Sequence, residues 1–353
     1  MIGIREEAYR IFMDRLSRLA VFLNDDSIND IMINRSDRIF IERNGRIEMI
    51  SMGLDEYAVE AAIRAVMSLN DKDVAPIMDA RLPGLRIACA LPPVSVHGPS
   101  MVIRRHAGRH IALDEYADTD SFALQVEVGV DMAEGGIDEE RHEAESAAAE
   151  GGAGLMKFFR WAVVNRKNIM IVGGTGSGKT TLLKSCLLEV PHGERLITCE
   201  DTNEITVAQP NHLQFEAYYP PGGEKAITIR DLIKHSLRSR PDRIIVGEVR
   251  GSEAYDMLDA MNTGHSGTLC TLHADSAELG LRRLESLVRM APEAGQMSVA
   301  DIRETVASAI DYVAHISRVG ERRMVMEVIA VDGATGGNYC VRELFRKRVI
   351  RSV

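Results

Sequence analysis

The residues with the clearest chemical potential form a glycine-rich stretch in the middle of the chain. Positions 173–180 read Gly-Gly-Thr-Gly-Ser-Gly-Lys-Thr and fit the phosphate-loop pattern G-x-x-x-x-G-K-[ST]. Glycines let the backbone curl so that its N–H groups point at phosphate oxygens, and the start of the following helix adds a positive dipole end. In this pattern Lys179 reaches the β- and γ-phosphates, and Thr180 offers its hydroxyl to Mg²⁺. The predicted nucleotide-binding residues are Gly173, Gly174, Thr175, Gly176, Ser177, Gly178, Lys179, Thr180 and Thr181.

The residues on either side of this loop supply the setting that the pattern needs. Residues 168–172 are typical of a buried strand, and residues 181–188 place leucine and cysteine side chains on one face of a helix. A strand, a loop and a helix in that order are the context of phosphate loops. This context favours a binding site over the alternative, a glycine-rich turn without a ligand.

Acidic residues follow two further predicted strands and could complete such a site. Glu200 and Asp201 come directly after one apolar run, with Glu204 close behind, and Glu248 follows another. Ligands of an open α/β sheet bind at the carboxyl ends of its strands, so these acids are expected to face the phosphate loop if their strands are its neighbours in the sheet. One acid can hold Mg²⁺, directly or through water, and another can polarise the attacking water. We favour Glu200 as the catalytic base and Glu248 as the acid on the metal side; acids that only cap the following turns are the alternative.

Two histidines flank the next predicted strand, at 268–272. His273 ends this strand on the expected side of the sheet, where it could donate a hydrogen bond to the γ-phosphate or to the activated water. His265 lies in a loop bracketed by glycines. A lone histidine is more often structural, so the sequence leaves both readings open.

These residues belong to a region in which apolar strands alternate with helical patterns. Such alternation predicts an α/β fold with a mostly parallel sheet. The predicted strands are 168–172, 195–199, 243–247 and 268–272, and short strands near 312–318 and 323–331 close the chain.

A smaller α+β domain is predicted ahead of this region. Apolar residues at spacings of three and four indicate a helix at the start, and a second helix is expected near 55–69. Asn44-Gly45 between two apolar runs predicts a hairpin with a type I′ turn. Further strands are expected near 84–91 and 101–105.

An acidic stretch separates the two domains. Residues 131–150 carry a net charge of −7 out of −10 for the whole chain and contain almost no large apolar side chains. Such a composition predicts a flexible linker or surface loop, with an exposed acidic helix over 138–149 as the alternative. The predicted division is an N-terminal domain at 1–112, a linker with this acidic insert at 113–153 and a second domain at 154–353.

Taken together, four segments resemble the traffic ATPases of type II and type IV secretion, conjugation and pilus assembly. They are GGTGSGKTT (173–181), CEDTNEI (199–205), RPDRIIVGEVRGSEA (240–254) and MNTGHSGTLCTLHADS (261–276). A generic phosphate-loop enzyme ends the strand at 243–247 with Asp, whereas this chain has Gly247 followed by Glu248, as the family does. The segment 79–105 also looks like the family's N-terminal domain, and the chain is most similar to the conjugal-transfer TrbB and pilus-type CpaF branches.

This resemblance implies a RecA-like P-loop NTPase domain, ATP and Mg²⁺ as ligands, and a homohexameric ring. It places the ring in the cytoplasm, at the inner face of the inner membrane, in contact with membrane components of a secretion or pilus machine. It also implies that arginines of the N-terminal domain close over the phosphates. By motif position these are Arg86 and Arg104, with Arg81 and Arg105 as weaker candidates. Arg240 and Arg250 flank the second acidic strand end and are candidate charge sensors.

Three functions are compatible with these residues and with the resemblance. The first is an ATP-hydrolysing motor for type IV secretion or conjugal transfer, or for pilus assembly or type II secretion. The second is a nucleotide-gated assembly switch with little turnover, against which the full set of acids argues. The third is a nucleic-acid translocase; nearly neutral domains, one tryptophan and no basic–aromatic stripe argue against direct nucleic-acid binding.

Overall fold

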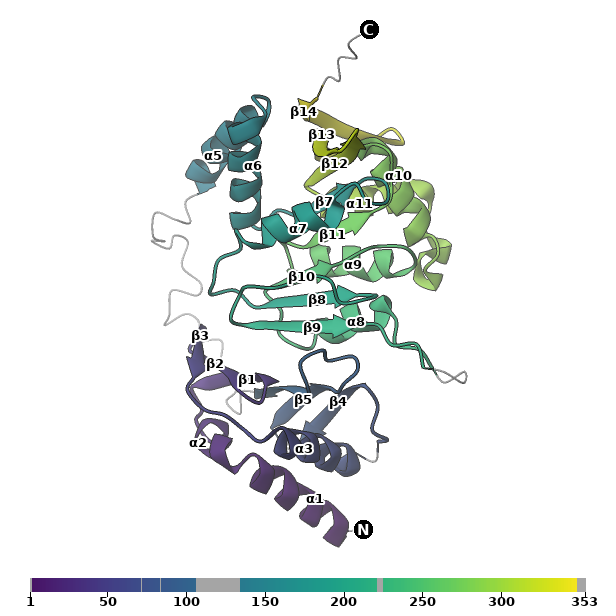
Figure 1. Ribbon diagram of the computed structural model, residues 1–353. Coiled ribbons are helices and arrows are strands. Elements are labelled where there is room, and N and C mark those ends of the chain that lie inside the picture. Colours follow the sequence, from purple (N-terminus) through teal and green to yellow (C-terminus); the bar gives the residue numbers. More distant parts are fainter. Residues whose placement is uncertain (1, 71, 83, 106–133, 221–224, 348–353) are drawn as a thin grey trace, which may run out of the picture.

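The computed structural model describes residues 2–347 except 71, 83, 106–133 and 221–224. Figure 1 shows two domains, the N-terminal one below a larger α/β domain. Among the described residues, no helix combines the length and the apolar character that crossing a membrane requires.

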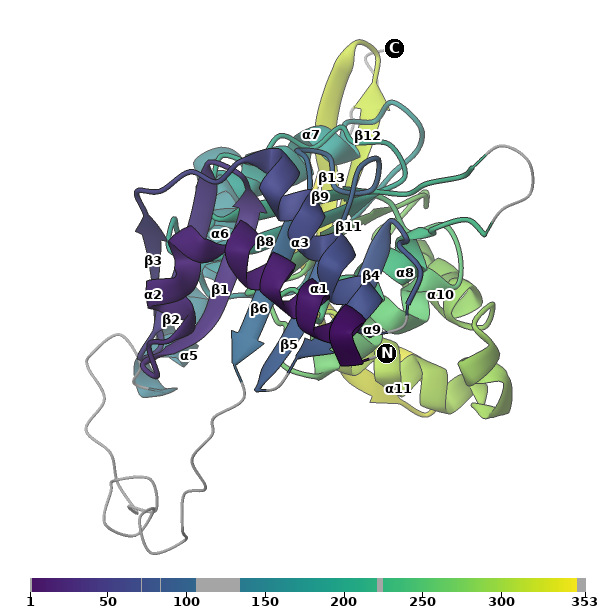
Figure 2. The same cartoon turned by 90° about the horizontal axis from the view of Figure 1, so that it is seen from below.

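The N-terminal domain is an antiparallel sheet with its helices on one face, so the predicted α+β class is confirmed. Its strands lie in the order β3-β2-β1-β6-β5-β4. Figure 2 shows the helices crossing this sheet, and their apolar side chains form a core against it. The expected turn is present, since Asn44 and Gly45 both have positive φ between β2 and β3. The elements are α1 (Ile2–Arg15), η1 (Ser17–Leu19), α2 (Ala20–Leu23), β1 (Ile28–Arg35), β2 (Arg38–Arg43), β3 (Arg46–Ile50), α3 (Glu56–Leu69), β4 (Ile77–Leu82), β5 (Leu85–Ala90) and β6 (Ser100–Arg105).

The C-terminal domain is built on an eight-stranded sheet in the order β14-β13-β12-β7-β11-β10-β8-β9. Six neighbouring strands from β12 to β9 run parallel, and β13 and β14 add an antiparallel edge. The predicted mostly parallel sheet is therefore confirmed. Its strands are β7 (Ile169–Val172), β8 (Leu196–Glu200), β9 (His212–Glu216), β10 (Arg243–Val246), β11 (Leu269–Leu272), β12 (Tyr312–Val319), β13 (Arg322–Thr335) and β14 (Asn338–Arg346).

Helices cover both faces of this sheet, which explains why its central strands are apolar throughout. In β7, Ile169 and Ile171 face a core with α5, α6 and α7, whereas Met170 and Val172 face the core with α8 to α11. The elements are α5 (Glu134–Ala148), α6 (Gly152–Val164), α7 (Lys179–Leu187), α8 (Ile229–Ser236), α9 (Glu253–Asn262), α10 (Ala277–Val288), η4 (Pro292–Gln296) and α11 (Val299–Ala309).

The acidic stretch differs from the flexible segment that its composition predicts. Its described part forms α5, close to the alternative of a helix over 138–149, and this helix packs on α6 and β14. Glu145 is buried and accepts hydrogen bonds from Tyr312 (2.7 Å), Arg342 (2.8 Å) and Arg141 (2.9 Å). Burial acts to raise the pKa of Glu145, but these three donors outweigh it and lower the pKa to about 2. The hydrogen bonds of one buried carboxylate therefore hold in place a helix whose composition alone predicts a flexible segment. The domain boundaries at 112 and 154 stay predictions.

The two domains meet along the edge strand β9. Ser95, in the loop after β5, forms an antiparallel bridge with Phe215 of β9. The backbone N–H of Val96 donates to Gln214 (3.2 Å), and that of Glu216 donates to Val94 (3.0 Å). This loop thus adds a short strand-like segment to the edge of the larger sheet.

Buried polar side chains reinforce the contact at the amino ends of β8 and β9. Arg195 is fully buried, and its guanidinium donates to the side-chain oxygens of Asn34 (2.6 Å) and Asn211 (2.5 Å). Burial lowers the pKa of Arg195 to about 9. The N-terminal domain therefore docks along the edge strand β9, with Asn34 near the amino ends of β8 and β9 and the loop that holds Ser95 near the carboxyl end of β9.

Candidate nucleotide-binding site

The glycine-rich loop links β7 to α7 at the carboxyl edge of the sheet, as the pattern predicts. Gly176 and Gly178 have φ of 70° and 100°, a region that favours glycine. The Nζ atom of Lys179 donates to the carbonyl oxygens of Gly173 and Gly174, both at 3.0 Å. Burial lowers the pKa of Lys179, while the nearby Glu248 acts to raise it. The ammonium group is thus held inside the loop, where the phosphates of a nucleotide would replace the two carbonyl oxygens as partners.

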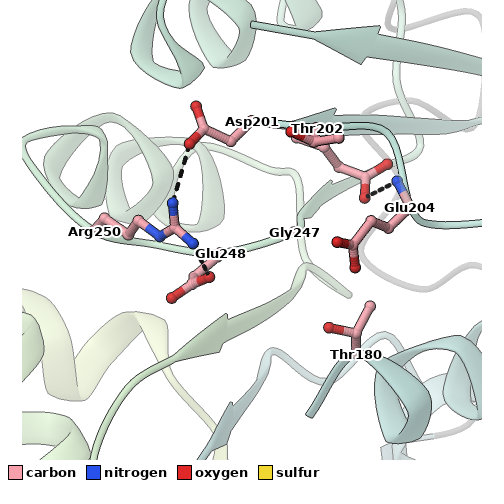
Figure 3. Close-up of a pocket in the computed structure, with 8 residues that line it drawn as sticks. Thr180, Asp201, Thr202, Glu204, Gly247, Glu248 and Arg250 are labelled. Carbon is pink, nitrogen blue, oxygen red and sulfur yellow. Dashed lines mark hydrogen bonds and ion pairs between the residues drawn. The ribbon is translucent and has the colours of Figure 1, made fainter. Parts of the chain in front are cut away.

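The two predicted acids converge on this loop from neighbouring strands. Glu200 ends β8, and Glu248 follows β10 by two residues. Both line a cavity of about 130 Å³ together with Thr180, the second residue of α7. Figure 3 shows Thr180 and Glu248 on opposite sides of this space. An adjoining cavity of about 410 Å³ lies over the phosphate loop and includes Lys179, Glu248 and His273.

Glu200 is the more deeply buried of the two acids. Its carboxylate accepts hydrogen bonds from the backbone N–H groups of Glu204 and Ile205, both at 3.0 Å. Burial raises the pKa of Glu200, against the lowering effect of these two donors. A raised pKa brings a carboxylate nearer to the range in which it can accept a proton from water.

The structure gives a steric reason for Gly247, where generic phosphate-loop enzymes have Asp. A methyl group added at Gly247 would lie 2.9 Å from Cγ of Glu200, which is too close for carbon atoms. Gly247 therefore leaves room for the Glu200 side chain. The acid of this strand then comes one residue later, as Glu248.

We expect Gly247→Ala to lower ATP turnover by about 10²-fold, because displacing a reacting group by even an ångström can cost that much. ADP affinity should change little, since the phosphate loop is untouched. The matched control is Gly193→Ala, because an added methyl group there has no neighbour within 4 Å. Steady-state turnover and calorimetric ADP titration measure both effects. Full activity in the Gly247 variant would mean that the position of Glu200 is not critical.

Glu248 belongs to a chain of charged contacts. Its Oε1 lies 2.8 Å from Nε2 of His273, and its Oε2 accepts a hydrogen bond from Arg250 at 2.7 Å. Arg250 also binds Asp201 at 3.1 Å, and Figure 3 shows it between the two carboxylates. His273 in turn lies 3.4 Å from Nζ of Lys179. The structure thus brings His273 and Arg250 to the predicted site.

The N-terminal arginines lie elsewhere in this chain. Arg104 pairs with the buried Asp30 at 2.8 Å, and Arg86 lies opposite Arg104 in the pairing of β5 with β6. Among the described residues that line the two cavities at the phosphate loop, none comes from the N-terminal domain. The resemblance implies that Arg86 and Arg104 close over the phosphates. Within one chain the structure does not place them there.

Two other candidates also lie far from the phosphate loop. Arg240 precedes β10 and forms ion pairs with Glu42 and Asp242. His265 lies in the turn before β11, so it too is at the amino ends of the strands. Of the two candidate histidines, the structure brings only His273 to the site. Of the two arginines that flank the second acidic strand end, it brings only Arg250.

Arg323, at the start of β13, is a residue of the site that the sequence does not predict. Its Nε donates to the carbonyl oxygen of Gly176 at 3.2 Å, and its side chain lies against Gly178. No motif surrounds Arg323, and its approach depends on the packing of β12 beside β7. Sequence spacing alone carries no sign of it.

The polar groups in the smaller cavity suit Mg²⁺, which prefers oxygen ligands. A hydroxyl from Thr180 and carboxylates from Glu200, Glu204 and Glu248 surround it. In the described part of the chain, no group of three or more His, Cys, Asp or Glu side chains forms a ready metal cage. Nucleotide-bound Mg²⁺ needs no such cage, because phosphates and water supply most of its ligands.

Comparisons with known proteins agree with this geometry. A family model described as "Type II/IV secretion system protein" matches residues 151–349. The chain is 35% identical to the conjugal transfer protein TrbB of Rhizobium radiobacter over 91% of its own length and 89% of that protein. It is 33% identical to the type IV secretion system protein VirB11 of Bartonella quintana, over 92% of its own length and 94% of that protein.

A solved structure extends the likeness to the fold. The VirB11 ATPase from the Brucella suis type IV secretion system, in complex with sulphate, superposes with a TM-score of 0.80 at 31% identity. The match covers 92% of this chain and 96% of that one, so both domains take part. The phosphate loop, its two acids and these matches together show that the chain belongs to the type II/IV secretion system protein family.

Proposed function

We propose that this protein is a Mg²⁺-dependent ATPase that works as a hexameric motor in type IV secretion or conjugal transfer. The observation that carries the proposal is the meeting of Lys179, Glu200 and Glu248 at one edge of the sheet. The relatives named above add the biological setting, because one is a conjugal transfer protein and another a type IV secretion protein.

Each residue of the site has a role in the proposed hydrolysis. Lys179 leaves the loop carbonyls and binds the β- and γ-phosphates, and the loop N–H groups hold the same oxygens. Glu200 accepts a proton from the attacking water, consistent with its raised pKa. His273, beside both Glu248 and Lys179, donates a hydrogen bond toward the γ-phosphate.

Thr180 and Glu248 are the residues that would hold Mg²⁺, directly or through water. When bound, the ion neutralises charge on the phosphate oxygens. Arg250 keeps Glu248 in place through their hydrogen bond of 2.7 Å and is itself braced by Asp201. Arg250 is therefore a positioning residue in this proposal.

Assembly completes the site in this proposal. The cavities at the phosphate loop are lined only by the C-terminal domain among the described residues, so their outer side is open to another copy of the chain. Closure of a ring could bring Arg86 or Arg104 of one copy toward the nucleotide of another. We further propose that the ring works in the cytoplasm, at the inner membrane, on membrane components of the secretion machine and without binding nucleic acid directly.

The test is ATP turnover per protomer as protein concentration rises. If assembly completes the site, specific activity should climb and then saturate, and the climb should coincide with ring formation measured by light scattering. Constant, appreciable activity down to concentrations at which only monomer is present would contradict the ring-dependent site. Absence of turnover at every concentration would instead favour a nucleotide-gated switch.

A further inference from the structure

A polar residue occupies a place in the central sheet where its neighbours are apolar. Thr271 is the third residue of β11, the strand between β7 and β10, and it is buried. Its neighbours on the same face of the sheet, Ile171 in β7 and Leu269 in β11, pack in the core with α7. A buried hydroxyl is costly unless it is hydrogen-bonded, so the contacts of Thr271 indicate what the residue does.

These contacts are made with the two peptide groups that flank Glu248. The hydroxyl of Thr271 donates to the carbonyl oxygen of Gly247 at 2.6 Å, and the backbone N–H of Val249 donates to the carbonyl oxygen of Thr271 at 2.9 Å. The regular pairing of β10 with β11 ends before this point, at Val246. Thr271 therefore holds the backbone of Glu248 where the strand itself has ended.

The side chain of Glu248 is restrained less firmly than its backbone. Its partners Arg250 and His273 keep 60% and 44% of their side-chain surfaces exposed. Both line the cavity over the phosphate loop, where a nucleotide and its Mg²⁺ would compete for them. The hydrogen bonds to Thr271 are made by the main chain on either side of Glu248 and do not depend on those partners.

Thr271 also connects Glu248 with the histidine of the site. His273 follows Thr271 by two residues, and its Nε2 atom lies 2.8 Å from the Glu248 carboxylate. A hydroxyl has one proton to donate, and that of Thr271 is directed at Gly247 rather than at a ligand. We propose that Thr271 is a positioning residue that holds Glu248 on the metal side of the phosphate loop.

This inference rests on the proposed function, and Thr271→Val tests it by removing the hydroxyl while keeping the shape of the side chain. The carbonyl oxygen of Gly247 then loses its donor, and Glu248 can shift. We expect the Mg²⁺ concentration for half-maximal ATP turnover to rise by about 10-fold to 100-fold, the usual cost of losing a group that orients a metal-binding residue. ADP affinity, measured calorimetrically without Mg²⁺, should stay within about twofold of the parent value, because Lys179 and the loop are unchanged.

Thr268→Val is the matched control for this variant. Thr268 immediately precedes β11, is equally buried and donates to the carbonyl oxygen of His265 at 3.1 Å, at the opposite end of the strand. Both variants lose one hydrogen bond of a buried threonine and should lose similar amounts of thermal stability. Only Thr271→Val should change the Mg²⁺ requirement, and Thr271→Ser, which keeps the hydroxyl, should retain that of the parent.

A double variant shows whether Thr271 acts through Glu248. Thr271→Val alone should weaken the binding of ADP in the presence of Mg²⁺. In the Glu248→Gln background the same substitution should change this affinity by less than about twofold, because the group to be positioned is already altered. Additive losses in the double variant, or a parent-like Mg²⁺ requirement in Thr271→Val, would overturn the positioning role alone. A parent protein that neither binds ADP nor turns over ATP would overturn the proposed function, and this inference with it.

Discussion

Lys179→Ala should reduce ATP turnover by about 10³-fold or more, because removing a preorganised cation from the transferring phosphate raises the barrier directly. In the structure the Lys179 ammonium already lies inside the loop, 3.0 Å from two carbonyl oxygens. No other residue of the loop at 173–180 carries a positive charge, and the neighbouring Arg323 lies on the carbonyl oxygen of Gly176 rather than inside the loop. Phosphate release from ATP, followed at saturating nucleotide, measures the effect.

The control for this variant is Lys157→Ala on α6. Lys157 is exposed and takes no part in either cavity at the phosphate loop. Turnover should stay at the parent level in that variant. Activity in Lys179→Ala within tenfold of the parent would show that the reaction takes place elsewhere in the molecule.

The second large effect is expected for Glu200→Gln. The amide has nearly the shape of the carboxylate but cannot accept the proton of the attacking water, so turnover should fall by about 10²- to 10⁴-fold. ADP and ATP affinity should persist, since the phosphate loop is intact. The raised pKa of Glu200 also predicts a pH dependence of the parent protein. Its activity should fall as the pH drops through this pKa, because the catalytic base becomes protonated.

Glu143→Gln provides a matched control, because Glu143 is an exposed acid on α5. Its turnover should equal that of the parent. The biological readout is more decisive than the kinetics. If Glu200→Gln and Glu248→Gln both support full secretion or transfer, hydrolysis is dispensable and the protein is a nucleotide-gated switch.

The parts of the site that the sequence predicts are those written in contiguous residues. The phosphate loop needs only a strand, six residues and a helix in succession, so local spacing determines it. The acids follow from a general property of parallel sheets, whose carboxyl ends share one edge. This property places Glu200 and Glu248 at the same edge, and they meet there because β8 and β10 are neighbours in the sheet.

The parts that the sequence did not predict depend on distant segments. Arg323 reaches the loop only because β12 pairs with β7 and with the start of β13. Helix α5 is another case, since its stability depends on Glu145 meeting Arg342 almost two hundred residues later. Composition describes a segment in isolation, whereas both features arise from contacts with segments that are distant in the sequence.

The strand-like pairing between the N-terminal domain and β9 restricts how the two domains can move. Backbone hydrogen bonds on both sides of Ser95 must break if one domain slides along the other. The twist between paired strands, by contrast, varies by tens of degrees at low cost. The pairing with β9 therefore opposes sliding of the N-terminal domain along this strand, and the hydrogen bonds of Asn34 with Arg195 and Asn211 also oppose rotation about it.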